Sequence, residues 1–317
     1  MARDNGEALA TGLILAGHGR NYVVEASGGQ HVLCHLRGKK SDTVVGDRVR
    51  WLATDTRGEH GVIESIEPRR NLLYRQDEWR TKSFAANLDR LMVLVAAEPV
   101  FSESQLTRAL IAAEQARIPA LIVLNKIDLT DAAQAARQRL APYKAMGYEV
   151  MELAFKAKDG TGNTDLTPAA ARSRLMPLLG DGVTLVLGPS GTGKSTLVNL
   201  LVPEAEAQVG EISTALNSGR HTTTHTRWYW LDEAHRAALI DSPGFQEFGL
   251  QHIPIEDLAH WMPDLRAAAQ QGCRFHNCSH DHEPGCAVLA ALARGEISPS
   301  RHRIYLELRS ELSRQPR

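Results

Sequence analysis

The sequence of 317 residues lacks long apolar runs and a strong net charge. Its longest apolar stretches, such as Leu91–Ala97 and Val183–Leu187, are far too short to span a bilayer. The start, Met1–Glu7, lacks the basic-then-apolar pattern of a signal peptide, so we expect a cytoplasmic protein without a membrane partner. The formal net charge of −1 excludes a global polycation, so any nucleic-acid contact would need local patches. We expect no DNA partner.

Cysteine is also scarce, and three of the four cysteines fall between residues 273 and 286. Cysteines clustered with histidine in a cytosolic chain point to a metal rather than to disulfides. Three thiolates and one imidazole are typical of a closed, structural Zn²⁺ site. The ligands that the spacing favours are Cys273, Cys278, His280 and Cys286. The neighbouring His276 and His282 are alternative ligands.

The pattern of strand-like and helix-like segments changes twice along the chain. Residues 1–82 hold short β-like runs punctuated by glycine, which predict a small closed β-barrel, with the OB-fold as one solution. From about Asn87 strand-like and helix-like segments alternate, which predicts a doubly wound α/β sheet. After about Leu250 we expect a small unit stapled by zinc and closed by a terminal helix. The predicted domains are 1–82, 83–250 and 251–317, and we expect a monomer.

A phosphate-binding signature, Gly188-x4-Gly193-Lys194-Ser195, follows a strand-like run and opens a helix. Its glycines let backbone N–H groups face a β-phosphate, and the helix N-terminus adds its dipole. Lys194 supplies a point charge, for which we count it as catalytic, and Ser195 would ligate Mg²⁺. We expect nucleotide contacts from Gly188, Pro189, Ser190, Gly191, Thr192, Gly193, Lys194, Ser195 and Thr196.

A base-reading signature stands at the carboxyl end of an earlier strand-like run. It consists of Asn125, Lys126, Ile127 and Asp128. Asp128 can accept hydrogen bonds from guanine N1–H and N2–H₂, which adenine cannot offer, and Lys126 can lie along the base. A site built on such paired polar groups rejects the wrong base strongly. The pattern favours GTP over ATP, the alternative nucleotide.

The order of these two signatures is unusual. In an ordinary GTPase the phosphate loop comes first, whereas here the base-reading motif precedes it. The sequence therefore predicts a circularly permuted P-loop GTPase domain.

Two further segments have the spacing of nucleotide-sensing switches. Asp241-Ser242-Pro243-Gly244 follows a strand-like run, so Asp241 would hold Mg²⁺ through water and the Gly244 amide would meet the γ-phosphate. Between the phosphate loop and this segment lies Gly219–Thr224. We expect Thr223 to complete the magnesium shell, with Thr222 as the alternative.

The residue after Gly244 is Phe245, and a phenyl ring cannot orient a water molecule. We therefore expect slow intrinsic hydrolysis that depends on another group or on a partner. His221 is the candidate catalytic residue, since imidazole can position or deprotonate water. Gln246 is the alternative.

These residues, in this order, resemble the RsgA (YjeQ) family of ribosome-small-subunit-dependent GTPases. The similarity covers nearly the whole chain and includes Val44–Val49 and Ala86–Asp89. The resemblance implies an N-terminal OB-fold that binds RNA, a permuted GTPase domain with Mg²⁺ and GTP or GDP, and a C-terminal zinc domain with the four ligands above. It also implies a late step in maturation of the 30S subunit, contacts with 16S rRNA, and hydrolysis stimulated by the subunit.

One departure from the family pattern concerns the second guanine-contact loop. The usual Ser-Ala-Lys-like sequence is replaced by Leu153-Ala154-Phe155-Lys156, which keeps Lys156 but not the small pair. We therefore expect weaker nucleotide affinity. The alternative function is an RNA-binding scaffold with a degenerate nucleotide site, and the intact Lys194, Ser195 and Asp241 argue against it.

Overall fold

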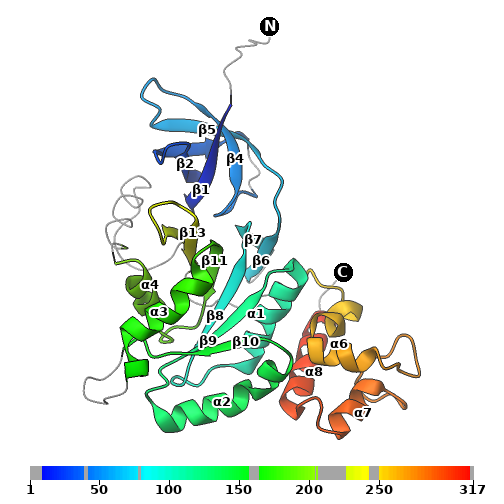
Figure 1. Cartoon of the computed structure of the whole chain (residues 1–317). Coiled ribbons are helices and arrows are strands. Elements are labelled where there is room, and N and C mark those ends of the chain that lie inside the picture. The colour runs from blue at the N-terminus through cyan, green and yellow to red at the C-terminus, as the bar shows by residue number, and fades with distance from the viewer. Residues whose placement is uncertain are drawn as a thin grey trace.

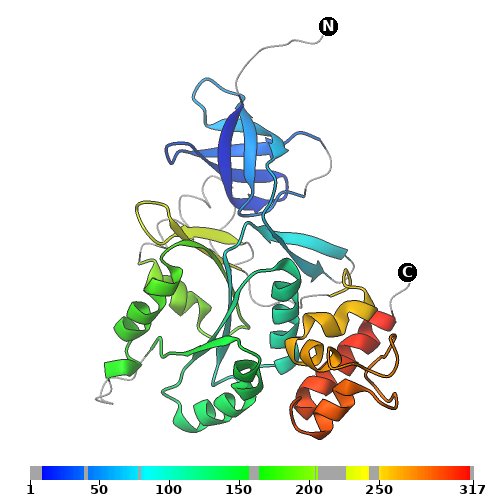
Figure 2. The same ribbon diagram turned by 45° about the vertical axis from the view of Figure 1, so that its right-hand side comes forward.

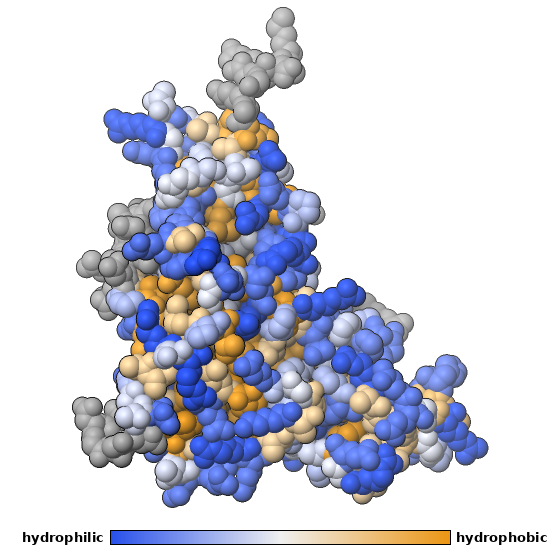
Figure 3. All heavy atoms as spheres, viewed as in Figure 1, coloured by the Kyte–Doolittle hydropathy of each residue, from blue (hydrophilic) through white to orange (hydrophobic). Residues whose placement is uncertain are grey.

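The computed structural model describes residues 9–38, 42–77, 80–156, 164–203, 205, 226–242 and 250–314, without the side chains of residues 75–82. Three units follow one another along the chain (Figure 1, Figure 2). A small barrel stands at one end of a central sheet, and a group of helices lies beside that sheet. On the face shown in Figure 3, hydrophilic residues dominate the helical unit, and apolar residues show mainly over the central unit.

The first unit is a closed barrel whose strands follow the order β1-β2-β3-β5-β4. Strands β3 and β5 run parallel, and the other pairs are antiparallel. The strands are β1 (Ala10–His18), β2 (Asn21–Ala26), β3 (His31–Leu36), β4 (Arg48–Ala53) and β5 (His60–Ile66). Alternate residues point inward, as Val49 and Trp51 do on β4. This five-stranded Greek-key barrel has OB topology, which confirms the predicted fold.

The central unit is a six-stranded sheet in the order β10-β9-β8-β11-β13-β12. Neighbours are parallel except β12, which runs antiparallel to β13 at one edge. The strands are β8 (Arg90–Ala96), β9 (Ala120–Asn125), β10 (Glu149–Glu152), β11 (Gly182–Leu187), β12 (Arg227–Trp230) and β13 (Ala237–Asp241). Near-continuous apolar runs form β8 and β9 because both faces of a parallel sheet are covered.

Helices cover both faces of this sheet, as predicted for a doubly wound fold. They are α1 (Glu103–Ala116), α2 (Thr130–Ala145), η1 (Thr164–Leu166), α3 (Pro168–Leu179) and α4 (Lys194–Leu201). One core joins α1 and α2 to the sheet through residues such as Leu106 and Leu140. A second core joins α3 and α4 to the other face through Leu175 and Leu197.

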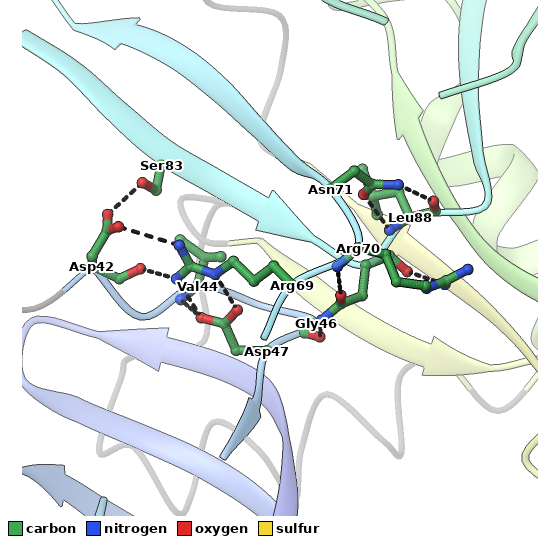
Figure 4. A network of polar contacts seen from close by, with 10 residues as sticks. Asp42, Val44, Gly46, Asp47, Arg69, Arg70, Asn71, Ser83 and Leu88 are labelled. Carbon is green, nitrogen blue, oxygen red and sulfur yellow. Dashed lines mark hydrogen bonds and ion pairs between the residues drawn. The ribbon is translucent and has the colours of Figure 1, made fainter. Parts of the chain in front are cut away.

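A hairpin, β6 (Leu72–Asp77) and β7 (Arg80–Ala86), links the barrel to the sheet. Figure 4 shows the polar contacts around this link. Arg69 holds the fully buried Asp47 with two bonds, Nε–Oδ1 at 2.7 Å and Nη2–Oδ2 at 2.9 Å. Asn71 and Leu88 exchange two bonds of 2.7 and 2.8 Å across the hairpin base. The predicted domain boundary at residue 82 lies inside β7 and stays a prediction.

The third unit consists of three short helices, η2 (Ile255–Trp261), α6 (Pro263–Ala269) and α7 (Ala287–Ala293), and the longer α8 (Pro299–Ser313). Their apolar core includes Ile111 of α1, so the unit rests on the central domain. Within the described ranges, no helix combines the length and apolar character needed to cross a membrane.

Candidate nucleotide-binding site and metal centre

The two nucleotide signatures meet at one edge of the sheet. Strands β9 and β11 are each followed at their carboxyl ends by one of the signatures, and parallel strands bring these ends together. A cavity of about 520 Å³ lies between them. Its walls are Asn125, Lys126, Asp128, Leu129, Phe155, Lys156, Pro189, Ser190, Gly191, Gly193, Lys194, Ser195 and Thr196. Residues that lie far apart in the sequence thus form one site.

Asn125 joins three loops of this cavity. Its side chain is only 3% exposed, and Nδ2 donates a hydrogen bond of 2.8 Å to the backbone oxygen of Thr192. Its Oδ1 accepts a bond of 3.1 Å from the backbone N–H of Phe155. The amide therefore joins the backbone of the phosphate loop to that of the 153–156 loop. Asn125 also lines the cavity, so its predicted contact with the base stays a prediction.

The phosphate loop needs glycine at specific positions. Gly191 and Gly193 adopt positive φ angles of 82° and 105°. A Cβ atom at Gly193 would lie 2.5 Å from Nδ2 of Asn125, and one at Gly188 would lie 2.6 Å from the backbone oxygen of Leu94. The loop then opens α4 at Lys194, so that helix N–H groups face the cavity. This arrangement suits an anionic phosphate.

Four predicted contact residues that the structure describes do not line the cavity: Ile127, Gly188, Thr192 and Asp241. Ile127 packs on the core of the sheet and donates its N–H to the oxygen of Leu153 at 3.4 Å. Thr192 donates its hydroxyl to Pro189 at 2.8 Å and thereby shapes the loop. Ile127 and Thr192 support the walls of the site.

Three wall residues were missing from the predicted contacts: Leu129, which follows the base-reading motif, Phe155 and Lys156. Phe155 is buried in the core beneath α4, and its ring would lie 3.4 Å from a Cβ at Gly193. The departure of the 153–156 loop from the family pattern was the sequence signal for Phe155. A buried phenyl ring here replaces the small residue of that pattern.

Asp241 ends β13 beside the phosphate loop and is 6% exposed. Its Oδ1 has no hydrogen-bond partner among the described residues. Burial raises the pKa of this carboxyl group, while the charges of Lys194 and Arg227 act in the opposite direction. A buried carboxylate oxygen without a partner is costly unless an ion or water satisfies it. The geometry therefore fits a hydrated Mg²⁺, to which Asp241 would bind through water.

Several predicted residues lie outside the part of the chain that the structure describes. They are His221, Thr223 and Gly244, together with the alternatives Thr222 and Gln246. Their roles stay predictions.

The structure brings together the four predicted zinc ligands, Cys273, Cys278, His280 and Cys286, with all ligand atoms within 4.8 Å of one another. Nδ1 of His280 lies 3.4 Å from the Cys286 sulfur and 3.7 Å from the Cys273 sulfur. A tetrahedral Zn²⁺ centre has sulfur–nitrogen edges of about 3.5 Å, so these atoms could hold a metal ion. Burial lowers the pKa of His280, which favours the neutral ring that a metal needs.

The alternative ligands His276 and His282 are exposed and stand outside this group. The loop is instead supported by a residue that was not predicted, Glu283. Its carboxylate accepts the N–H groups of Ser279 at 2.7 Å and Asp281 at 3.1 Å. Burial raises the pKa of Glu283, but these hydrogen bonds outweigh it and hold the pKa well below its usual range. The sequence signal for Glu283 was its place between the predicted ligands His280 and Cys286. A loop with little apolar core has many backbone N–H groups that a carboxylate can accept.

Helix α8 contacts the backbone of the loop that carries the candidate metal ligands Cys278 and His280. His302 lies 2.8 Å from the backbone oxygen of His280, and the hydroxyl of Tyr305 donates to the oxygen of Ser279 at 2.9 Å. Such outer contacts orient metal ligands.

A phosphate loop on a parallel sheet, facing a base-reading motif that precedes it in sequence, defines a circularly permuted P-loop GTPase. The fold and the cavity thus confirm the predicted fold class. The model of one family, RsgA GTPase, matches residues 66–251. The chain belongs to this family of GTPases.

Relatives resemble the chain over nearly its full length. The small ribosomal subunit biogenesis GTPase RsgA of Variovorax paradoxus (strain S110) is 56% identical over 309 residues, which cover 96% of this chain and 93% of the relative. The protein of the same name from Burkholderia pseudomallei (strain K96243) is 53% identical, covering 97% and 94%.

Two solved structures share the fold. YloQ, described as a circularly permuted GTPase, aligns with a TM-score of 0.68 at 25% identity, over 100% of both chains. YjeQ from Thermotoga maritima aligns with a TM-score of 0.69 at 26% identity, over 97% of this chain and 100% of that one.

Proposed function

We propose that this chain acts in the biogenesis of the small ribosomal subunit, as the names of its relatives indicate. In this proposal it binds the 30S subunit and its 16S rRNA in the cytoplasm as a monomer, and the subunit stimulates hydrolysis of GTP to GDP and phosphate. The observation that carries the nucleotide part is the shared cavity, in which Asn125 joins the base-reading and phosphate loops.

The base would lie against the 125–129 loop. Asp128 lines the cavity and would accept the N1–H and N2–H₂ groups of guanine. Lys126 and Lys156, both on the cavity wall, would flank the base. Asn125, which lines the cavity, would face the base and also hold the base-reading loop on the phosphate loop, while the partly buried Ile127 would act through its packing on the sheet core.

The phosphates would lie in the loop from Gly188 to Thr196. Lys194 would neutralise charge on the transferred phosphoryl group. Ser195 and Asp241 would position Mg²⁺, which supplies charge stabilisation between the phosphates when it is bound. In the same scheme Thr223 would be a further magnesium ligand, the Gly244 amide would meet the γ-phosphate and His221 would position the water.

Zn²⁺ would occupy the Cys273, Cys278, His280 and Cys286 group as a structural ion. Four protein ligands leave no open position for a substrate, which supports a structural role.

The main test is the GTP hydrolysis rate with added small subunits, large subunits or free RNA. We expect a rise in kcat with small subunits and little change with the others. An equal response to all three, or none, would contradict the proposal. Lys194→Ala should abolish the stimulated rate, which separates turnover by this chain from a contaminating activity.

Base selectivity is tested separately by competition with labelled GTP. Excess ATP should not compete, because adenine leaves Asp128 without a donor. Asp128→Asn should weaken GTP and favour xanthosine triphosphate, whose C2 oxygen accepts from an amide. Effective competition by ATP in the parent chain would contradict guanine reading.

A further inference from the structure

The barrel contacts the central sheet through a buried carboxylate. Glu25 on β2 is 8% exposed, and both of its oxygens lie 3.2 Å from the donating indole nitrogen of Trp230. Nδ1 of His235 lies 3.3 Å from the same carboxylate. The rings of Trp230 and His235 stack with centroids 4.3 Å apart and an angle of 10°. One barrel residue thus holds both ends of the turn between β12 and β13.

Strand β12 lies at the edge of the sheet. Within the described sheet only β13 pairs with it, whereas β13 is paired on both sides. The other neighbour of β12 is barrel strand β1, and Leu15 of β1 shares an apolar core with Trp228. In Figure 2 the barrel stands directly over this hairpin. The barrel therefore packs against β12 in addition to the pairing of β12 with β13.

The opposite end of the hairpin lies at the nucleotide site. Arg227, the first residue of β12, pairs in register with Asp241, the last residue of β13. Trp230 and Arg227 are three residues apart, or about 10 Å along an extended strand. A shift of β12 against the barrel would therefore change the backbone opposite Asp241.

We propose that Glu25 is a positioning residue of the nucleotide site, which acts by fixing β12 on the barrel and so couples barrel attachment to the magnesium end of the cavity. The proposal rests on the proposed function only in taking Asp241 as the residue that positions Mg²⁺. Coupling between two sites is reciprocal, so Mg²⁺ and GTP would in turn change the contact at Glu25. A purely stabilising role for Glu25 would produce no such link.

Tryptophan fluorescence tests the link without ribosomes. We expect emission to differ between the GDP form and the form with Mg²⁺ and a non-hydrolysable GTP analogue. Trp230→Phe should remove most of this difference, while the control Trp261→Phe, in the C-terminal unit, should keep it. A difference that survives Trp230→Phe would overturn the proposal, as would no difference in the parent chain.

The Mg²⁺ dependence of basal hydrolysis distinguishes a positioning role of Glu25 at the nucleotide site from a role in the stability of the fold alone. Glu25→Ala should raise the Mg²⁺ concentration for half-maximal rate by about fivefold, at the lower end of typical couplings. Glu25→Gln should restore it, because the amide oxygen still accepts from Trp230. The control Glu64→Ala removes another barrel carboxylate, which pairs with Arg37 away from the hairpin, and should leave the midpoint unchanged.

A lower melting temperature for Glu25→Ala without a shifted Mg²⁺ midpoint would overturn the proposal. Because neither readout uses ribosomal subunits, a failure of subunit stimulation would count against the proposed function alone.

Discussion

The two outer units meet the central domain through different kinds of contact. In the C-terminal unit, Arg301 is 2% exposed and holds Asp264 with bonds of 2.8 and 2.9 Å. It also donates to the hydroxyl of Thr107 on α1 at 2.7 Å and lies over the ring of Tyr143 on α2. In the barrel, by contrast, Glu25 contacts an edge hairpin, and its partner His235 has a side chain that is 44% exposed.

This difference indicates two mechanical roles. The buried guanidinium of Arg301 is paired with Asp264 of its own unit and donates across the junction to Thr107, so a shift of the unit against α1 would leave a buried donor without its partner. The contact at Glu25 has a partly hydrated partner, so it costs less to rearrange. We infer that the C-terminal unit is a fixed support for α1 and α2, whereas the barrel can respond to the nucleotide site.

Metal removal should have the largest effect, and this effect should be confined to the C-terminal unit. A strong chelator should unfold the loop around Cys273–Cys286, because a structural zinc site contributes on the order of 10 kcal/mol to folding. The unfolding should spread to α7 and α8 and leave the barrel intact. Circular dichroism and hydrogen exchange before and after chelation check this, and the zinc content of each sample is measured alongside. Loss of barrel protection at the same chelator concentration would contradict it.

Arg301→Ala should have the next largest effect. It leaves Asp264 buried and unpaired, so we expect the free energy of unfolding to fall by about 3 to 5 kcal/mol. Urea unfolding followed by fluorescence measures this. The control Arg303→Ala removes an arginine of the same helix whose side chain is 71% exposed, and it should change stability by less than about 0.5 kcal/mol. Equal effects of the two variants would contradict the inference that Arg301 fixes the C-terminal unit on α1 and α2.

Arg69→Ala tests the base of the barrel. Asp47 is fully buried, so loss of its partner should cost about 2 kcal/mol. The neighbouring Arg70 has a side chain that is 61% exposed and pairs with Asp89, so Arg70→Ala should cost less than about 1 kcal/mol. Thermal unfolding of both variants provides the comparison. A larger loss for Arg70→Ala would contradict the ranking by burial.

Acidification should have the smallest effect on the barrel junction. Burial raises the pKa of Asp89, but hydrogen bonds from Arg70 and Val183 outweigh it, so the folded pKa lies below the usual value. The stabilisation is therefore fully present above the unfolded pKa of about 3.9 and is lost as pH falls through the lower folded pKa. We expect no change from this pair between pH 5 and 8. Asp89→Asn should flatten the loss of stability below about pH 4.

Much of the fold was predictable because the determining signals are local. The runs in β8 and β9 are almost entirely apolar, and both nucleotide motifs have strict spacing, so these strands and the doubly wound sheet could be predicted from the sequence. The four candidate metal ligands were predicted from residue type and spacing, and their ligand atoms do come together.

The elements that were not predicted carry weak local signals. Strand β12 has only four residues, Arg-Trp-Tyr-Trp, and α3 contains Pro177 within its twelve residues. The hairpin β6–β7 is rich in charged residues, which hides its pairing. The contacts of Glu25 and Arg301 join residues about two hundred positions apart, so no local pattern could reveal them.

The contrast between a responsive barrel and a fixed C-terminal unit is tested most directly by hydrogen exchange on the full chain. The GDP form is compared with the form that holds Mg²⁺ and a non-hydrolysable GTP analogue. We predict that exchange changes in residues 21–26 and 227–230, at the contact between β2 and β12, while residues 299–308 of α8 keep the same protection. A change in α8 without a change in β2 and β12 would contradict the account.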